Sequence, residues 1–142
     1  MNPRASTISH IFLKTSHGAP MDAVKSATAI TGEGLQNDVS RGRKLRQILI
    51  VDALTIQEFG LSPGELRENI ILEGQSLSSA AAGTVIQIGD AKLEVTLDCS
   101  PCDFLDDIRS GLQDDLKGRR GTLCRVLDGG VITVGDSVTL SD

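Results

Sequence analysis

The sequence predicts a mostly β fold in which short strands close into a distorted β-barrel, accompanied by two or three short helices. Short apolar runs recur between turn residues, a spacing typical of strands rather than of helices. Glycine-containing turns at 89–90 and 128–130 each separate two alternating runs, which is the signature of a β-hairpin. Many short strands joined by hairpins favour a barrel.

Nine strands are expected, each marked by a short apolar or alternating run bounded by turn residues. Their ranges are 9–14, 24–30, 46–52, 69–72, 84–88, 92–96, 122–126, 131–134 and 137–140. The chain has 142 residues and no internal repeat or low-complexity linker. One domain over residues 1–142 is therefore expected, with a flexible N-terminus at 1–7.

Two helical segments interrupt the strands. In the first, at 52–59, apolar residues face one side and Gly60 can adopt the left-handed conformation that ends a helix. In the second, at 101–117, apolar residues recur at steps of three and four, which predicts an amphipathic surface helix. Gly111 is expected to weaken or break this helix, because glycine costs about 1 kcal/mol relative to alanine inside a helix.

Composition excludes several classes of partner. The formal charge is -5, and the chain has no Trp or Tyr, so neither charge attraction nor base stacking favours nucleic acid. The apolar runs are too short to span a bilayer, and residues 1–7 lack the apolar core of a secretory signal. We therefore expect a cytoplasmic protein with no membrane partner. Its three cysteines are then expected to be free thiols, with Cys124 in the core.

The segment from Cys99 to Cys102 carries the sharpest chemical signal. Ser100 is suited to cap the second helix and Pro101 to occupy its first position, which predicts that Cys102 lies in the first helical turn. There the free N–H groups and the helix dipole favour a reactive thiolate, although neighbouring aspartates oppose it. Cys102 is the candidate catalytic residue. Burial of Cys102 as a small hydrophobic residue, and a redox or zinc-binding pair with Cys99, remain alternatives.

Two basic clusters stand out in this acidic chain, at 41–46 and 117–121. Arginine matches phosphate oxygens in a bidentate manner, and the glycines within both clusters allow the backbone to approach a ligand. The clusters predict a phosphate-binding site, with solvated surface loops as the alternative.

In their order and spacing, these pieces resemble the MOSC family, named for the C-terminal domain of molybdenum cofactor sulfurase. The first matching segments are 20–21, 34–38, 46–49, 63–64, 66–70, 83 and 88–89. The strongest part comprises the cysteine motif at 99–102 and the closing segments 118–121, 125–127, 129–130 and 134–136.

The resemblance implies a distorted barrel like that of pyruvate kinase and a function in handling the molybdenum cofactor. Family members act in cofactor sulfurases, in molybdenum-dependent reductases of N-hydroxylated compounds, or alone. The family cysteine corresponds to Cys102, which is expected to carry persulfide sulfur or to be a molybdenum ligand. The residues expected to contact the phosphate and pterin of the molybdenum cofactor (molybdopterin) are Asp38, Arg46, Arg67, Asn69 and Arg120.

The expected partners are a small-molecule pterin ligand and either a cysteine desulfurase or a molybdoenzyme. No pyridoxal phosphate site is expected, because the aminotransferase-like portion of the full sulfurases is absent from this chain. The sequence departs from the family at 37–40, where many members have Gly-Asp-Arg-His and this chain keeps only Asp38. Two alternatives are a non-catalytic barrel that binds a pterin-like or purine-like ligand, and a CxxC thiol-disulfide protein.

Overall fold

The computed structural model describes residues 6–77 and 80–141, which form eleven strands and three short helices. In chain order these are β1 (Ser6–Leu13), β2 (Asp22–Val24), β3 (Ser26–Ile30), β4 (Gly34–Leu35), β5 (Ile48–Asp52), α1 (Ala53–Glu58), β6 (Ile70–Glu73), β7 (Val85–Ile88), β8 (Ala91–Asp98), α2 (Leu105–Ile108), α3 (Leu112–Asp115), β9 (Thr122–Asp128), β10 (Gly130–Thr133) and β11 (Ser137–Ser141).

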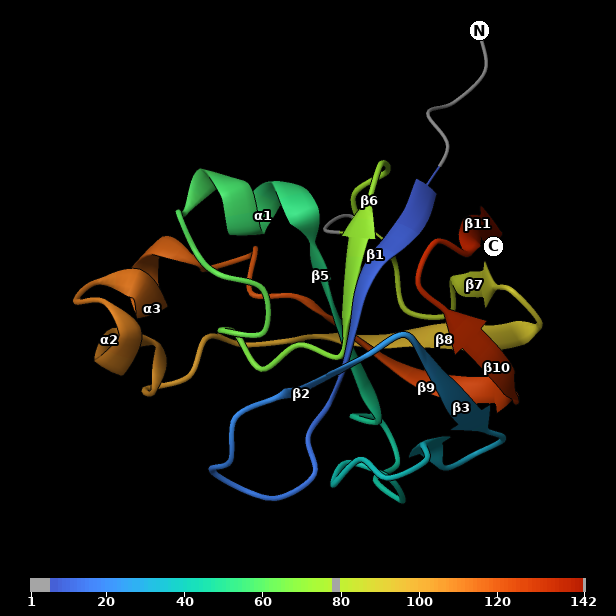
Figure 1. The fold of residues 1–142 in the computed structure, drawn as a ribbon. Coiled ribbons are helices and arrows are strands. Elements are labelled where there is room, and N and C mark those ends of the chain that lie inside the picture. The colour runs from blue at the N-terminus through green and yellow to red at the C-terminus, as the bar shows by residue number, and fades with distance from the viewer. Residues whose placement is uncertain (1–5, 78–79, 142) are drawn as a thin grey trace, which may run out of the picture.

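Seven of these strands close into a barrel. Their order is β11-β7-β8-β9-β5-β6-β1, and β1 pairs with β11 to complete the circle. Neighbours are antiparallel except β5 and β6, which run parallel and are connected through α1. The small sheet β10-β3-β4 lies on one side of the barrel, and all three helices lie on the other side of the barrel (Figure 1). The predicted mostly β barrel is confirmed.

Alternation along the strands divides the buried side chains into two clusters. In β5, Ile48 and Ile50 point into the barrel, whereas Leu49 and Val51 point outward. The inner cluster is aliphatic and fills the barrel. The outer cluster receives Ile56 of α1 and Leu105 of α2, so the helices cover the outside of the wall. Burying each such Leu or Ile contributes about 2 kcal/mol.

Two predicted elements differ from the structure. The strand expected at 24–30 is divided at Lys25, because β2 pairs with β1 whereas β3 pairs with β10 and β4. The flexible segment expected at 1–7 differs at Ser6 and Thr7, which belong to β1; its residues 1–5 lie outside the described part of the chain.

The helix predicted at 101–117 is wrong in its start, whereas the break expected at Gly111 is confirmed. It begins at Leu105, and Gly111, with φ of 87°, separates α2 from α3. The Cys99 N–H donates to the Gly121 carbonyl, so sheet pairing continues beyond β8 and the chain must turn before a helix can form. Cys102 therefore precedes the helix, and its predicted place in the first helical turn is wrong.

Candidate functional site

A pocket of about 150 Å³ lies outside the barrel, between the ends of its strands and the chain that leads into α2. Five cationic side chains line it, and they come from widely separated parts of the sequence. They are Lys14, Arg43, Arg46, Arg67 and Arg120. The other lining residues are Ser40, Leu49, Asn69, Cys99, Cys102, Phe104 and Leu123. We call this the cationic pocket.

Arg120 is the most unusual of these residues because it is only 3% exposed. Its Nη2 donates to the Leu66 carbonyl at 2.7 Å, and its guanidinium lies 5.6 Å from the centre of the Phe104 ring. Within the described residues, Nε and Nη1 have no hydrogen-bond partner. Buried donors are almost always satisfied, so these two N–H groups indicate a site for an acceptor.

The neighbouring glycine explains how Arg120 comes to be buried. Gly121 has φ of +143°, and a Cβ there would lie 2.7 Å from Leu49 Cδ1 and 3.0 Å from the Ile50 carbonyl oxygen. Only glycine allows this close approach to β5. The start of β9 is thereby held tightly against β5.

Glu68 supplies a carboxyl group near Arg120. It is fully buried, and its Oε2 accepts a hydrogen bond from the Gly64 N–H at 2.9 Å. Burial raises the pKa of Glu68, while hydrogen bonds from backbone N–H groups and the charge of Arg120 oppose that rise. Its Oε1 has no partner among the described groups.

Lys14 follows β1 directly and was not predicted as a site residue. Burial lowers its pKa, and the positive charges of Arg67, Arg120 and Arg43 lower it further, against the opposing effect of Asp38. Lys14 and the three arginines therefore lie close enough for their charges to repel one another. Its position at the end of the expected strand 9–14 was the only available signal in the sequence.

Asp38 and Asn69 cross-link the walls of the pocket. Asp38 accepts hydrogen bonds from the Lys14 N–H at 2.7 Å, the Ser40 N–H at 3.0 Å and Asn69 Nδ2 at 3.0 Å. Asn69 also donates to the Phe12 carbonyl and accepts from the Leu49 N–H. These contacts use most of the polar groups of both side chains inside the protein, which favours a positioning role. Their expected contact with a cofactor stays a prediction.

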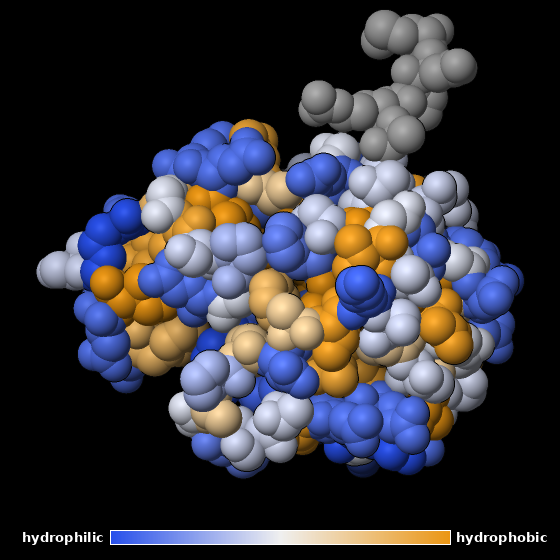
Figure 2. Space-filling model, in the orientation of Figure 1, coloured by the Kyte–Doolittle hydropathy of each residue, from blue (hydrophilic) through white to orange (hydrophobic). Residues whose placement is uncertain are grey.

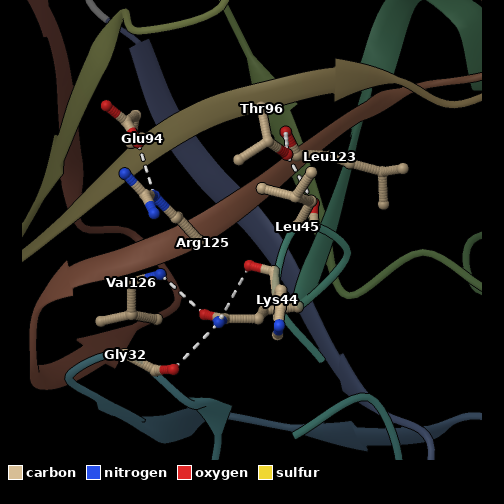
Figure 3. A network of polar contacts seen from close by, with 9 residues as sticks. Gly32, Lys44, Leu45, Glu94, Thr96, Leu123, Arg125 and Val126 are labelled. Atoms are coloured by element: carbon tan, nitrogen blue, oxygen red, sulfur yellow. Dashed lines mark hydrogen bonds and ion pairs between the residues drawn. The ribbon is translucent and has the colours of Figure 1, made fainter. Parts of the chain in front are cut away.

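Gln47 anchors the loop that carries Arg43 and Arg46. Figure 3 shows the polar network around Gly32, Lys44 and Val126. The Gln47 side chain is 2% exposed, and its Nε2 donates to the carbonyls of Gly32 and Lys44 at 3.1 and 3.4 Å. Its Oε1 accepts a hydrogen bond from the Val126 N–H of β9 at 2.9 Å. One buried amide therefore ties this loop to the barrel wall.

Arg67 has a left-handed backbone conformation, with φ of 60°. Non-glycine residues rarely adopt this conformation, and such strain tends to occur at functional sites. Its Nη1 donates to the Ala19 carbonyl at 3.1 Å, which leaves other guanidinium N–H groups beside the pocket.

The three cysteines differ in accessibility. Cys102 is exposed and lines the cationic pocket, so the alternative that it is a buried packing residue is wrong. Cys99 also lines the pocket but is buried, and both thiols approach the Ser100 carbonyl, at 3.8 Å for Cys99 and 3.5 Å for Cys102. Cys124 belongs to the inner cluster, as expected, and burial raises the pKa of its thiol.

Only part of each basic cluster reaches the pocket. Arg43, Arg46 and Arg120 line it. Arg41 instead pairs with Glu33, and Arg119 with Glu58. Of the five residues expected to bind the cofactor, the structure places four in the pocket together with Cys102. These four are Arg46, Arg67, Asn69 and Arg120. Asp38 supports them from behind through Asn69.

A family model named MOSC domain matches residues 45–139, which is more than half of the chain. The chain belongs to the MOSC domain family. This confirms the resemblance seen in the sequence, and the family is associated with functions related to the molybdenum cofactor. Four residues around the pocket precede the segment that the family model matches: Lys14, Asp38, Ser40 and Arg43.

Solved structures show the same fold at low sequence identity. The YUAD protein of Bacillus subtilis is 19% identical, with a TM-score of 0.82 over 99% of this MOSC chain and 98% of that chain. YiiM of Geobacillus stearothermophilus is 18% identical, with a TM-score of 0.75 over 96% and 75% of the two chains. YiiM of Escherichia coli is 18% identical, with a TM-score of 0.71 over 96% and 70%. A search of curated proteins found no match.

Two further findings concern this MOSC domain. Among residues 6–77 and 80–141, no group of three or more His, Cys, Asp or Glu side chains could hold a metal ion. This finding does not test the expected molybdenum ligand, because that expectation involves one side chain, Cys102. Within the same ranges, no helix combines the length and the apolar character needed to cross a membrane.

Proposed function

We propose that this MOSC domain binds the molybdenum cofactor through its phosphate group in the cationic pocket, with Cys102 as the residue that carries sulfur or contacts the metal. The observation that carries the proposal is the buried Arg120 guanidinium, whose Nε and Nη1 have no protein partner within the described residues. A phosphate offers oxygens that satisfy such donors, and arginine binds them in a bidentate manner.

The donor set fits the cofactor. Arg46, Arg67 and Arg120 would hold the phosphate by charge and hydrogen bonds, and Lys14 would add a further positive charge. The soft sulfur of Cys102 suits a metal such as molybdenum. When bound, the cofactor supplies the redox chemistry of its metal.

For sulfur transfer, the exposed position of Cys102 allows a donor protein to reach it. The Cys102 thiolate would attack the outer sulfur of a donor persulfide. The donor's S–S bond breaks, a new S–S bond forms at Cys102, and the donor leaves as a thiolate. A separate cysteine desulfurase would provide the persulfide.

Persulfide formation tests the carrier role. After incubation with a cysteine desulfurase and cysteine, mass spectrometry should find one added sulfur at Cys102 in the native chain and in Cys99→Ser, but none in Cys102→Ser. Labelling at Cys124 alone, or at no site with an active desulfurase, would exclude the carrier role. Loss of the label in Cys99→Ser would indicate a redox pair instead.

Native mass spectrometry of protein made in a host that synthesises the cofactor tests binding. The native chain should retain the cofactor mass, and Arg46→Ser should lose it. Arg41→Ser is the matched control, since Arg41 lies in the same loop but pairs with Glu33 outside the pocket. A native chain that retains no cofactor would overturn the binding proposal, and equal retention by both variants would exclude Arg46 as a contact.

A further inference from the structure

An apolar groove of about 390 Å³ lies next to the cationic pocket. Its apolar lining residues are Phe12, Pro20, Met21, Pro63, Phe104 and Ile108, and we call it the ring groove. They come from β1, the chain before β2, the chain after α1, and the region of α2. Figure 2 shows hydrophobic surface on the side of the molecule that carries the three helices in Figure 1.

The chain concentrates its few rings in this groove. It has three Phe and four Pro in total, and no Trp or Tyr. Two of the Phe and two of the Pro line the ring groove, whereas the barrel interior is aliphatic. These rings give the groove an apolar lining that favours contact with another apolar ring.

Phe12 forms a closely fitted part of the groove. Its ring is 6% exposed and lies against Gly64, where an added Cβ would be 3.3 Å from Cε1 of the ring. Gly64 has φ of +88°, a conformation that other residues rarely adopt. Its N–H is the group that binds Glu68, the buried carboxyl near Arg120. The wall of the groove and the back of the cationic pocket are thereby built from the same few residues.

Two side chains line both the ring groove and the cationic pocket. Arg67 and Phe104 contribute to each, and the Phe104 ring also contacts the guanidinium of Arg120. The charge differs sharply between the two cavities. The cationic pocket has five positive side chains, whereas the charged residues of the groove are Glu65 and the shared Arg67. A ligand that spans both cavities must therefore be anionic at one end and apolar at the other.

We infer that the ring groove binds the apolar ring of a small organic anion whose charged group lies at Arg67 and the cationic pocket. The inference rests on the proposed function in that both need the pocket to bind anions. A volume of about 390 Å³ is within the range of small-molecule sites and suits one or two fused rings. A pterin would leave its hydrogen-bonding groups poorly satisfied against this apolar lining. The groove therefore suits an apolar ring rather than a pterin, and the anionic group of such a ligand would compete with the cofactor's phosphate for the cationic pocket.

The test compares inorganic phosphate with 2-naphthyl phosphate as calorimetric titrants of the native chain. Naphthyl phosphate should bind at least about tenfold more tightly, which corresponds to about 1.4 kcal/mol, because only its ring reaches the groove. Met21→Ser should remove most of this advantage without changing the affinity for inorganic phosphate. The double variant Met21→Ser with Ile108→Ser should remove it further, with folding checked by circular dichroism.

Leu54→Ser is the matched control, because Leu54 is a 56% exposed apolar residue outside the groove. It should retain the full advantage of naphthyl phosphate. If inorganic phosphate binds but naphthyl phosphate binds no more tightly, the groove inference is overturned and the anion pocket stands. If neither binds, both are overturned. If the advantage persists in the double variant, the ring lies elsewhere and the inference fails.

Discussion

Arg67 offers a test in which backbone strain and ligand binding give separate signals. Its φ of 60° is costly for any residue with a Cβ and easy for glycine. Arg67→Gly and Arg67→Ala both remove the guanidinium and its hydrogen bond to the Ala19 carbonyl. The two variants differ in one respect: alanine has a Cβ that is strained at this positive φ, whereas glycine has none.

The magnitude follows from opposing terms. The left-handed conformation costs a non-glycine residue about 1–2 kcal/mol. Glycine loses about 0.5–1 kcal/mol more than alanine in chain entropy on folding. Arg67→Gly should therefore be about 0.5–1 kcal/mol more stable than Arg67→Ala, or about 2 °C higher in Tm for a chain of this size. At ordinary positions the order is reversed.

Urea unfolding followed by far-UV circular dichroism measures the difference, since the chain has no Trp or Tyr for intrinsic fluorescence. Arg41 supplies the control, because its φ is not positive, and Arg41→Gly should be less stable than Arg41→Ala. Both Arg67 variants should bind inorganic phosphate about tenfold more weakly than the native chain, since hydrogen bonds to charged groups contribute about 1.5–3 kcal/mol. If Arg67→Gly is the less stable of the pair, the strain argument is refuted; unchanged phosphate affinity would refute the role of Arg67 as a contact.

Three further predictions concern titratable side chains. In urea unfolding, Cys124→Ser should lower the free energy of unfolding by about 1–3 kcal/mol, because it places a hydroxyl in the apolar inner cluster. Cys102→Ser, at an exposed position, should change it by less than about 0.5 kcal/mol. Because burial raises the pKa of Glu68, its ionisation opposes folding as the pH rises above about 4.3, so the stability of Glu68→Gln relative to the native chain should increase between about pH 4 and pH 7. Because burial and three arginines lower the pKa of Lys14, phosphate binding should be accompanied by proton uptake at pH values below the ordinary lysine pKa of about 10.4. Calorimetry in buffers of different ionisation enthalpy measures the uptake, and Lys14→Met should abolish it.

Each has a clear contrary result. Equal stability losses for the two cysteine variants would contradict the burial assigned to Cys124. A relative stability of Glu68→Gln that is constant with pH would mean that its carboxyl is not desolvated. Buffer-independent heats for the native chain at alkaline pH would mean that Lys14 does not respond to the bound anion.

The barrel was predictable because its signal is local. The continuous apolar run of β5, the turn at 89–90 and the break at Gly111 each depend on a few adjacent residues. The start of α2 could not be predicted, because it depends on the hydrogen bond from the Cys99 N–H to the carbonyl of Gly121. Gly121 is distant from Cys99 in the sequence. A cap sequence at Ser100 could not outweigh this tertiary contact.

The cationic pocket was predictable only in part. The dense runs of basic residues identified Arg46 and Arg120, but nothing local distinguished Arg120 from Arg119, which pairs with Glu58 on the surface. That difference depends on the close packing at Gly121 against β5. Lys14 was missed because a single lysine after a strand is common, and its importance comes from three arginines brought near it by the fold.

The scattered origin of the pocket has a thermodynamic consequence. Its five cations lie between residues 14 and 120, so no part of the unfolded chain can present them together. An anion that binds there selects the closed barrel over every open form of the chain. At a concentration of one hundred times its dissociation constant, such a ligand would add about 2.7 kcal/mol to the free energy of unfolding. The mutual repulsion of those cations lowers the stability of the empty folded protein. A bound anion offsets that repulsion and makes the protein more resistant to unfolding.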